Sequence, residues 1–168
     1  MSIRIAFTGP ESSGKSTFAK WVAERLSNAV YVAEYARVFL ESKKKQRANI
    51  EDFKHIVEIS LAQYGADSTH DYVIFDGDWC MLEVWNEWEF QIDMPLSNSE
   101  FHLTFLCYPD IPWEMDPLRS LPRIEDRLLV FTQIEKKLKA SGDHYVVLKG
   151  SREQKEAMII ASLNAFQK

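Results

Sequence analysis

The segment GPESSGKST, residues 9–17, constrains the fold more strongly than any other part of this 168-residue sequence. It fits the pattern GxxxxGK[ST], and it stands between an alternating apolar run at 2–8 and a pattern of helical spacing at 15–26. In such a strand, loop and helix, the glycines let backbone N–H groups point inward, and the helix N-terminus adds partial positive charge. The segment therefore predicts a phosphate-binding loop of the Walker A type, although a glycine turn without a ligand is the alternative.

Two side chains of this loop are expected to take part in the chemistry. Lys15 has the length to reach the β and γ oxygens of a bound nucleoside triphosphate. Ser16 lies at the position whose hydroxyl commonly binds Mg²⁺. The loop thus predicts both a phosphate site and half of a metal site.

The rest of the chain alternates between apolar runs of strand length and patterns of helical spacing. This order predicts a single α/β domain, residues 1–168, with a five-stranded parallel sheet covered by helices on both faces. In such folds, ligands bind beyond the carboxyl ends of the strands. The strand-like runs are 2–8, 29–33, 71–78, 101–109 and 144–150, and the helical patterns are 15–26, 34–44, 49–65, 79–90, 125–140 and the segment from 151 onward.

Several helix ends carry recognisable signals. Asn49 with Asp52 begins one helix, Gly142 ends another, and Ser151 with Gln154 forms a capping box for the last one. The last helix is expected to turn four apolar residues toward the core: Ala157, Ile160, Ala161 and Leu163.

Composition narrows the classes of partner. The formal net charge of −5 argues against nucleic acid or a membrane surface as the main partner. No apolar stretch approaches the roughly 18 residues of a membrane span, and the N-terminus enters a strand pattern at once, so we expect no signal peptide and a cytoplasmic location. Cys80 and Cys107 are expected to be buried and unpaired. The sequence leaves open whether the chain forms homo-oligomers.

The apolar run YVIFD ends at Asp76, and Asp78 follows two residues later. A strand that ends in an aspartate at the carboxyl edge of the sheet is expected to supply a carboxylate to magnesium beside the phosphate loop. Ser16 and Asp76 are therefore the expected metal ligands. Either aspartate is also a suitable N-cap for the helix that starts at Trp79, and for Asp78 we keep both interpretations.

Glu34 follows the second strand directly, and Arg37 lies one helical turn later. Both side chains are expected to face the crevice that holds the phosphate loop. For Glu34 the alternative is structural, because an acidic residue in the first turn of a helix is favourable without any substrate. For Arg37 the alternative is a surface position.

Three arginines at a spacing of four, Arg119, Arg123 and Arg127, lie in and after a proline-containing stretch that follows the fourth strand. Such a stretch is able to close over a transferred phosphoryl group and stabilise its negative charge. The alternative is ordinary surface charge, because Glu125 and Asp126 are adjacent and able to pair with these arginines.

Trp85 and Trp88 follow the two aspartates on the next helical pattern. Their rings are able either to stack on a flat ligand ring or to pack in the core. Packing is the simpler interpretation, and it is kept beside the functional one.

Four parts of the sequence together resemble the ribosylnicotinamide (nicotinamide riboside) kinase domain of the NadR family. They are GPESSGKST, EYAR at 34–37, the aspartates at 76 and 78, and PDIPWEMDPLR at 109–119. The resemblance extends over nearly the whole chain. The loop motif alone is shared by many NTPases, but its combination with the other segments is much narrower.

The resemblance implies an adenylate-kinase-like P-loop NTPase fold, a three-layer sandwich with an arginine-bearing lid at about 109–127. It also implies transfer of the γ-phosphoryl group of ATP to the 5′ hydroxyl of nicotinamide riboside, which gives nicotinamide mononucleotide for NAD biosynthesis. ATP and Mg²⁺ would be held by the loop residues Gly9, Ser12, Ser13, Gly14, Lys15, Ser16 and Thr17.

The resemblance also implies roles outside the loop. Glu34 is the expected general base, with Asp78 as its rival. The expected catalytic set is Lys15, Glu34, Asp76, Arg119 and Arg123. The expected substrate-binding residues are Glu34, Tyr35, Arg37, Asp78 and Trp85.

Two other functions stay open at the level of sequence. The same loop, metal site and lid would serve a kinase of another nucleoside or of a small alcohol equally well. The second is a nucleotide-binding regulatory module without kinase activity. Residues 49–52, NIED, only approach the NKxD motif of guanine-specific switches, so GTP specificity is the less expected outcome.

Overall fold

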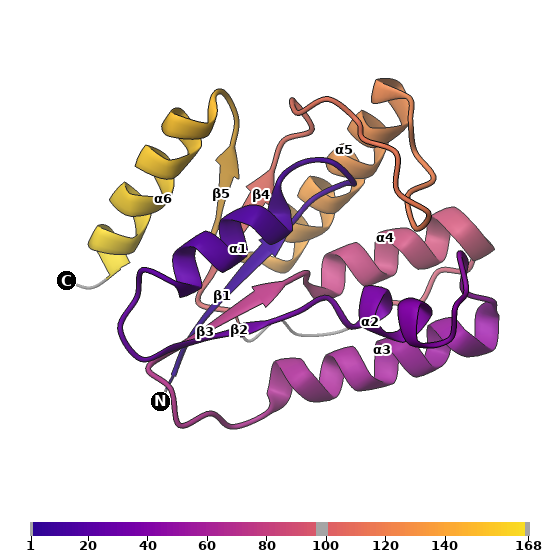
Figure 1. Cartoon of the computed structure of the whole chain (residues 1–168), viewed down its shortest axis with the longest axis horizontal. Helices are drawn as coiled ribbons and strands as arrows, with labels where there is room; N and C mark the ends of the chain where they lie inside the picture. The colour runs from indigo at the N-terminus through magenta and orange to yellow at the C-terminus, as the bar shows by residue number, and fades with distance from the viewer. Residues whose placement is uncertain (1, 97–100, 167–168) are drawn as a thin grey trace.

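The computed structural model describes residues 2–96 and 101–166, and within them five strands form one parallel sheet (Figure 1). The strand order is β2-β3-β1-β4-β5, and every neighbouring pair is parallel. The sheet and its direction confirm the predicted fold class. The strands are β1 (Ile3–Thr8), β2 (Ala29–Val32), β3 (Tyr72–Asp76), β4 (Leu103–Cys107) and β5 (Tyr145–Leu148).

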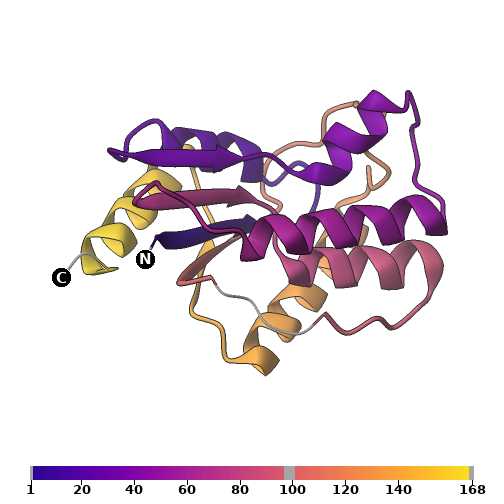
Figure 2. The same cartoon turned by 90° about the horizontal axis from the view of Figure 1, so that it is seen from below.

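The helices cover both faces of this sheet, as predicted (Figures 1 and 2). Two of them, α1 and α6, pack on one face, whereas α3, α4 and α5 pack on the other with α2 beside them. No helix in the two described ranges is long and apolar enough to cross a membrane. The helices are α1 (Lys15–Ala23), α2 (Tyr35–Ser42), α3 (Ile50–Gly65), α4 (Trp79–Phe90), α5 (Ile124–Ser141) and α6 (Arg152–Phe166).

The central strand β1 is buried on both faces from Ile5 to Thr8, because it lies between two neighbouring strands and beneath helices on either side. Phe7 stands beside Phe105 of β4, with ring centroids 4.9 Å apart. On its other side, Phe7 is paired in register with Asp76 of β3. The loops that follow β1, β3 and β4 therefore leave the same edge of the sheet next to one another.

The predicted helix-end signals are present. In the capping box of α3, the Asp52 N–H donates to Asn49 Oδ1 over 2.8 Å, and the Asn49 N–H donates to Asp52 Oδ2 over 3.1 Å. Gly142 ends α5 with a φ of 77°, a left-handed conformation that glycine adopts without steric cost. The Ser151 N–H donates to Gln154 Oε1 over 2.8 Å before α6.

The last helix turns a different face to the core than the sequence predicted. Ile159 is fully buried and Lys155 is 1% exposed, whereas Ile160 is 49% exposed and Ala157 and Ala161 lie on the surface. Of the four predicted residues, only Leu163 packs against the core, and the prediction was wrong for the other three because a lysine occupies the buried face of α6. Its charge removed that face from the apolar pattern.

The two cysteines are buried and unpaired, as predicted, and they lie in different layers. Cys80 belongs to α4 and packs among α3, α4 and α5, whereas Cys107 ends β4 and packs toward α1 and α6. Burial raises the pKa of both thiols, that of Cys107 to about 12.

Candidate active site

The loop between β1 and α1 has the backbone of a phosphate cradle. Gly9, Ser12 and Gly14 have φ angles of 136°, 50° and 90°. A Cβ atom on Gly9 would lie 2.5 Å from the carbonyl oxygen of Cys107, so no other residue fits there. Gly14 is the N-cap of α1 without a side-chain hydrogen bond, which leaves the first N–H groups of the helix available to an anion.

The polar side chains of the loop lie at the mouth of a cavity. Lys15 Nζ is 3.3 Å from the carbonyl oxygen of Pro10, so the lysine folds back over its own loop. The Ser13 hydroxyl donates to the same carbonyl over 2.7 Å. Ser16 and Thr17 are exposed at the start of α1. Except for Gly9, which lies buried behind the loop, all the predicted nucleotide-binding residues line the cavity.

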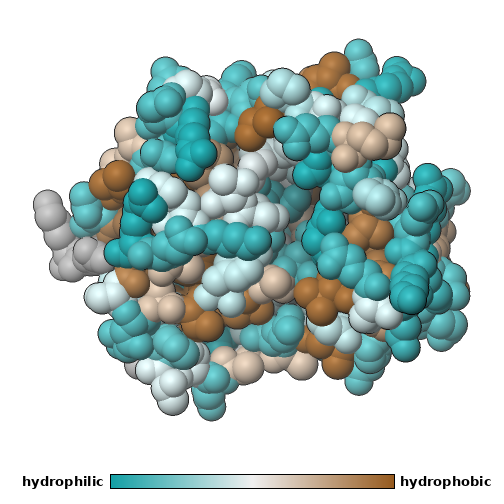
Figure 3. Space-filling model, viewed as in Figure 1, coloured by the Kyte–Doolittle hydropathy of each residue, from teal (hydrophilic) through white to brown (hydrophobic). Residues whose placement is uncertain are grey.

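The cavity has a volume of about 240 Å³ and extends from the phosphate loop to an apolar end. Residues 117–120, which follow β4 in sequence, form part of its wall. On the face shown in Figure 3, hydrophobic surface occurs only in small patches among hydrophilic groups. The apolar side chains of the cavity come from α2, α3, α4, the loop before α3 and the segment after β4: Ala36, Leu40, Ala48, Phe53, Ile56, Met81, Leu82, Trp85, Phe90, Pro117 and Leu118.

Glu34 lines the cavity between its two ends: Lys15 of the phosphate loop is the charge that acts on it most strongly, and the apolar lining residues Ala36 and Leu40 follow it on α2. Glu34 is the N-cap residue of α2, but its side chain makes no capping hydrogen bond, so its carboxylate stays free. Burial raises the pKa of Glu34 above its ordinary value, and the Asp76 and Glu11 carboxylates add to the rise while Lys15 and Arg37 oppose it. A half-buried carboxylate with a raised pKa suits proton transfer at neutral pH.

Asp76 lies at the end of β3, buried beneath the cavity rather than on its wall. Its Oδ2 accepts a hydrogen bond from the Tyr31 hydroxyl over 2.9 Å, and its Oδ1 is buried without a hydrogen-bond partner. Burial and the Asp76 charge raise the pKa of Tyr31, so the phenol stays a donor. A buried carboxylate oxygen that lacks a donor fits a cation as its partner.

Asp78 has the structural role that the sequence offered as its alternative. Its Oδ1 caps α4 by accepting from the Met81 N–H over 2.8 Å, and it also accepts from the Thr8 hydroxyl over 2.7 Å. Burial raises the pKa of Asp78 to about 6, although these two hydrogen bonds lower it. Asp78 is fully buried and does not line the cavity, so the structure does not place it with the other predicted substrate-binding residues that do.

Of the other predicted substrate-binding residues, two line the cavity and one does not. Trp85 lines the cavity. Arg37 also lines it, but its Nη1 is 3.2 Å from Asp116 Oδ2 and 3.3 Å from Glu41 Oε1. Tyr35 does not line the cavity, and its hydroxyl lies 3.2 Å from His55 Nε2.

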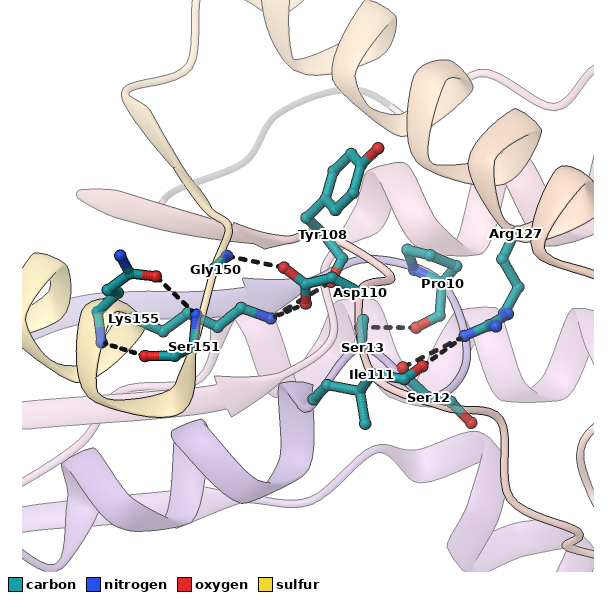
Figure 4. A network of polar contacts seen from close by, with 11 residues as sticks. Pro10, Ser12, Ser13, Tyr108, Asp110, Ile111, Arg127, Gly150, Ser151 and Lys155 are labelled. Carbon is teal, nitrogen blue, oxygen red and sulfur yellow. Dashed lines mark hydrogen bonds and ion pairs between the residues drawn. The ribbon is translucent and has the colours of Figure 1, made fainter.

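The three arginines at a spacing of four have three different environments. Arg119 lines the cavity, and its Nη1 donates to the Glu114 carbonyl over 3.0 Å. The Arg123 side chain is 70% exposed, 3.6 Å from Glu125, and does not line the cavity, so the structure does not bring it to the phosphate loop. Arg127 is 4% exposed, and its side chain joins the phosphate loop to the segment after β4. Its Nη1 donates to the Ile111 carbonyl over 3.0 Å and to the Ser12 carbonyl over 3.5 Å (Figure 4).

Sequence reasoning missed the residues that hold the segment after β4, residues 110–121, which we call the lid segment. Glu11 of the phosphate loop accepts hydrogen bonds from this segment. At the start of the segment, Asp110 pairs with the buried Lys155 and accepts from the Gly150 N–H over 2.7 Å (Figure 4). A signal existed for Glu11, because an acidic residue inside a phosphate-binding loop needs a partner.

Comparisons with known proteins bear on the family and the fold of the chain. A family model described as an AAA domain, AAA_28, matches residues 4–155. No curated protein matches the sequence. Among solved structures, a NadR protein in complex with NAD and AMP-PNP has a TM-score of 0.66 and 19% identity, over 96% of this chain and 48% of that one.

Two further solved structures are similar to the chain. A NadR protein in complex with NR has a TM-score of 0.63 and 18% identity, over 90% of this chain and 46% of that one. A thymidylate kinase from Ehrlichia chaffeensis has a TM-score of 0.62 and 16% identity, over 96% and 98% of the two chains. The chain thus spans about half of the length of the NadR chains.

At these identities, the likeness to solved structures is one of fold. The family match covers most of the chain, and the parallel sheet carries a glycine-bracketed phosphate loop after its central strand. The chain therefore belongs to the AAA_28 family of AAA domains and has the α/β fold of the P-loop NTPases.

Proposed function

We propose that this chain is a kinase that transfers the γ-phosphoryl group of ATP to the 5′ hydroxyl of nicotinamide riboside, giving nicotinamide mononucleotide. One observation carries the proposal. A single cavity joins the phosphate loop to an apolar, tryptophan-containing end, and the free carboxylate of Glu34 lies at the junction. This arrangement supports the proposal, because a triphosphate, a base and a flat ring bound there would lie in the order that phosphoryl transfer to a nucleoside needs.

At the phosphate end, the loop would hold ATP through backbone N–H groups and through Lys15. The lysine has only a carbonyl partner in the loop, so its ammonium is available to phosphate oxygens. Arg119 lies across the cavity on the lid segment and would neutralise charge that develops on the transferred group. Arg123 is the N-cap residue of α5, outside the lid segment, and it would take part only after this end of α5 moved toward the cavity.

At the junction, Glu34 would accept the proton of the 5′ hydroxyl. The hydroxyl oxygen then forms a bond to the γ-phosphorus, the bond from that phosphorus to the β–γ bridging oxygen breaks, and ADP leaves with those electrons. The raised pKa of Glu34 makes it a stronger base than a free glutamate. Asp78 is the weaker choice, because its Oδ1 is committed to Thr8 and Met81.

Magnesium fits the donors that surround the loop. Asp76 Oδ1 is buried without a partner, and the Ser16 hydroxyl is exposed at the start of α1. When bound, the ion would neutralise part of the negative charge of the phosphate groups. Asp76 would hold it through Oδ1 while Tyr31 fixes the orientation of Oδ2.

Solved structures of similar fold bear on the identity of the acceptor, and they point to more than one nucleoside. A NadR protein of similar fold has been seen in complex with NR, which supports nicotinamide riboside. A deoxyadenosine kinase from M. mycoides, in complex with dCMP, also has a similar fold, with a TM-score of 0.59. A kinase of another nucleoside is therefore the second candidate function.

The test is a panel of nucleosides, including nicotinamide riboside, adenosine, deoxyadenosine, thymidine and uridine, incubated with the purified chain, Mg²⁺ and labelled ATP. We expect labelled nicotinamide mononucleotide to form faster than any other product, and Lys15→Ala to abolish it. Fast labelling of another nucleoside with none of nicotinamide riboside would transfer the assignment to the second candidate. Tight nucleotide binding with no labelled product would indicate a regulatory module instead.

A further inference from the structure

Glu11 joins the phosphate loop to the lid segment through an unusual number of hydrogen bonds. Its Oε1 accepts from the Ser120 N–H over 2.7 Å and lies 3.5 Å from the Ser120 hydroxyl. Its Oε2 accepts from the Leu121 N–H over 3.0 Å and from Trp113 Nε1 over 3.3 Å. The partners are more than a hundred residues away in sequence, so this contact exists only in the folded chain.

An ionised carboxylate matches this set of donors, because it has two acceptor oxygens and no hydrogen to donate. The two oxygens take the N–H groups of consecutive residues, Ser120 and Leu121, as a fork. A glutamine would keep one acceptor oxygen and would point an NH₂ group at a backbone N–H. The side chain at position 11 is therefore specified by its contacts with the lid segment.

The fork fixes the backbone directly after Arg119. On the other side of Arg119, the chain makes a turn around Asp116. The Arg119 N–H donates to the Asp116 carbonyl over 3.0 Å, and Asp116 Oδ1 accepts from the Leu118 N–H over 2.9 Å. Asp116 is in turn paired with Arg37 of α2. The backbone of Arg119 is thus held from both sides, and its side chain lines the cavity.

The beginning of the lid segment is anchored separately. Asp110 is held by Lys155 and Gly150, and the carbonyl of Ile111 is held by Arg127 (Figure 4). These contacts are eight or more positions before Arg119. They secure the start of the segment, whereas Glu11 acts next to the arginine itself.

We propose that Glu11 is a positioning residue for phosphoryl transfer. By accepting hydrogen bonds from the N–H groups of Ser120 and Leu121, it holds Arg119 beside the transferred group. The inference rests on the proposed function. A carboxylate in a phosphate-binding loop repels the ligand unless its charge is compensated, and here the donors of the lid segment compensate it. The hydrogen bonds that join the loop to the lid segment therefore also position Arg119.

The test is a double-mutant cycle with Glu11→Gln, Arg119→Ala and the double variant, and with Glu58→Gln as a matched control. Glu58 is an exposed glutamate of α3 that does not line the cavity. We expect Glu11→Gln to lower kcat about 30-fold while the KM for ATP stays within about twofold, because a transition-state contact is lost. In the Arg119→Ala background, Glu11→Gln should have almost no further effect, and Glu58→Gln should have none in either background.

Trp113→Phe provides a milder second variant in case Glu11→Gln weakens the fold. It removes one donor to Glu11, and we expect a smaller fall in kcat that also disappears in the Arg119→Ala background. Urea unfolding of each variant shows whether the fold is retained. A fall in kcat of equal size in both backgrounds, or a rise in the KM for ATP alone, would show that Glu11 does not act through Arg119.

The cycle is measured on transfer to nicotinamide riboside and also on slow hydrolysis of ATP without an acceptor. If nicotinamide riboside is not the acceptor, the transfer rate is lost but ATP hydrolysis can still be measured. The two measurements therefore test the acceptor and the role of Glu11 independently. If Arg119→Ala leaves both rates unchanged while Lys15→Ala abolishes them, the kinase assignment stands and the role of Glu11 is overturned.

Discussion

The two ends of the cavity are built in opposite ways. The phosphate end consists of nine consecutive residues, 9–17, and its shape is set by the backbone conformations of Gly9, Ser12 and Gly14. The apolar end is assembled from side chains of α2, α3, α4 and the lid segment. A site made of backbone binds what many ligands share, whereas a site made of side chains distinguishes among them. Mutations at the phosphate end should therefore lower the rate for every acceptor. Mutations at the apolar end should change which acceptor the protein prefers.

The largest effect is expected at the phosphate end, from Lys15→Ala. Loss of the ammonium removes a charge from the transition state, and we expect kcat to fall on the order of a thousandfold for every acceptor. The exposed Lys136 of α5 provides the control, because Lys136→Ala should leave the rate unchanged. Steady-state kinetics with two different nucleosides measures both. If turnover survives Lys15→Ala, the loop does not hold the transferred phosphate.

At the junction, Glu34→Gln should lower kcat about a hundredfold, with a much smaller effect on ATP affinity. The pH profile gives the sign. Because burial raises the pKa of Glu34, the wild-type rate should rise with pH through a midpoint above the ordinary glutamate value of about 4.3. Glu34→Gln should lose this acidic limb. A variant that retains both the rate and the limb would transfer the role of base to another group.

At the apolar end, the choice of acceptor should depend on Trp85. We expect Trp85→Ala to raise the KM for the nucleoside about tenfold, because stacking on a flat ring is lost, while the KM for ATP stays the same. Trp88 lies on the same helix but does not line the cavity, so Trp88→Ala is the matched control. Equal changes in both variants would mean that Trp85 acts through packing of α4 alone.

The smallest effect belongs to Asp78, which lies behind both ends of the cavity. Its pKa is raised to about 6 in the folded chain, so the folded state holds the proton more tightly than the unfolded state. The stability from this group is present below the unfolded pKa of about 3.9 and is lost as the pH rises through about 6.

Asn is also a good N-cap, so Asp78→Asn should change the free energy of unfolding by about 1 kcal/mol or less at about pH 4.5, where the folded chain keeps Asp78 protonated. Relative to this variant, the wild type should lose stability between pH 4.5 and 7, measured by urea unfolding. A constant difference across that range would contradict the buried, raised pKa. An unchanged kcat in the variant would separate Asp78 from the chemistry.

The two ends also differ in how well the sequence predicted them. The phosphate loop was predicted with its elements because all of its determinants lie within nine residues. At the other end, Glu34, Trp85 and Arg119 line the cavity as expected, but Tyr35 and Asp78 do not. A shift of one position along a strand, or of two positions along a helix, turns a side chain to the opposite side, and sequence patterns do not fix where each element begins or ends to that precision.

Contacts between distant segments were beyond the reach of the sequence. Glu11 meets Ser120 across 109 positions, and Arg127 meets Ser12 across 115. The spacing of the arginines suggested one shared role, yet Arg127 became a buried clamp and Arg123 an exposed residue. Lys155 was missed for a related reason, because a buried lysine looks like surface until its partner Asp110 is placed.

The position of the two thiols has a practical consequence. Cys80 and Cys107 are buried on opposite sides of the sheet, and burial keeps both protonated and unreactive while the fold is closed. A thiol reagent would then reach each one only when its own layer opens. With one cysteine replaced by alanine, the labelling rate of the other measures how often the layer around it opens. Comparing the two single-cysteine variants with and without nucleotide would show whether nucleotide binding slows opening on one side of the sheet or on both.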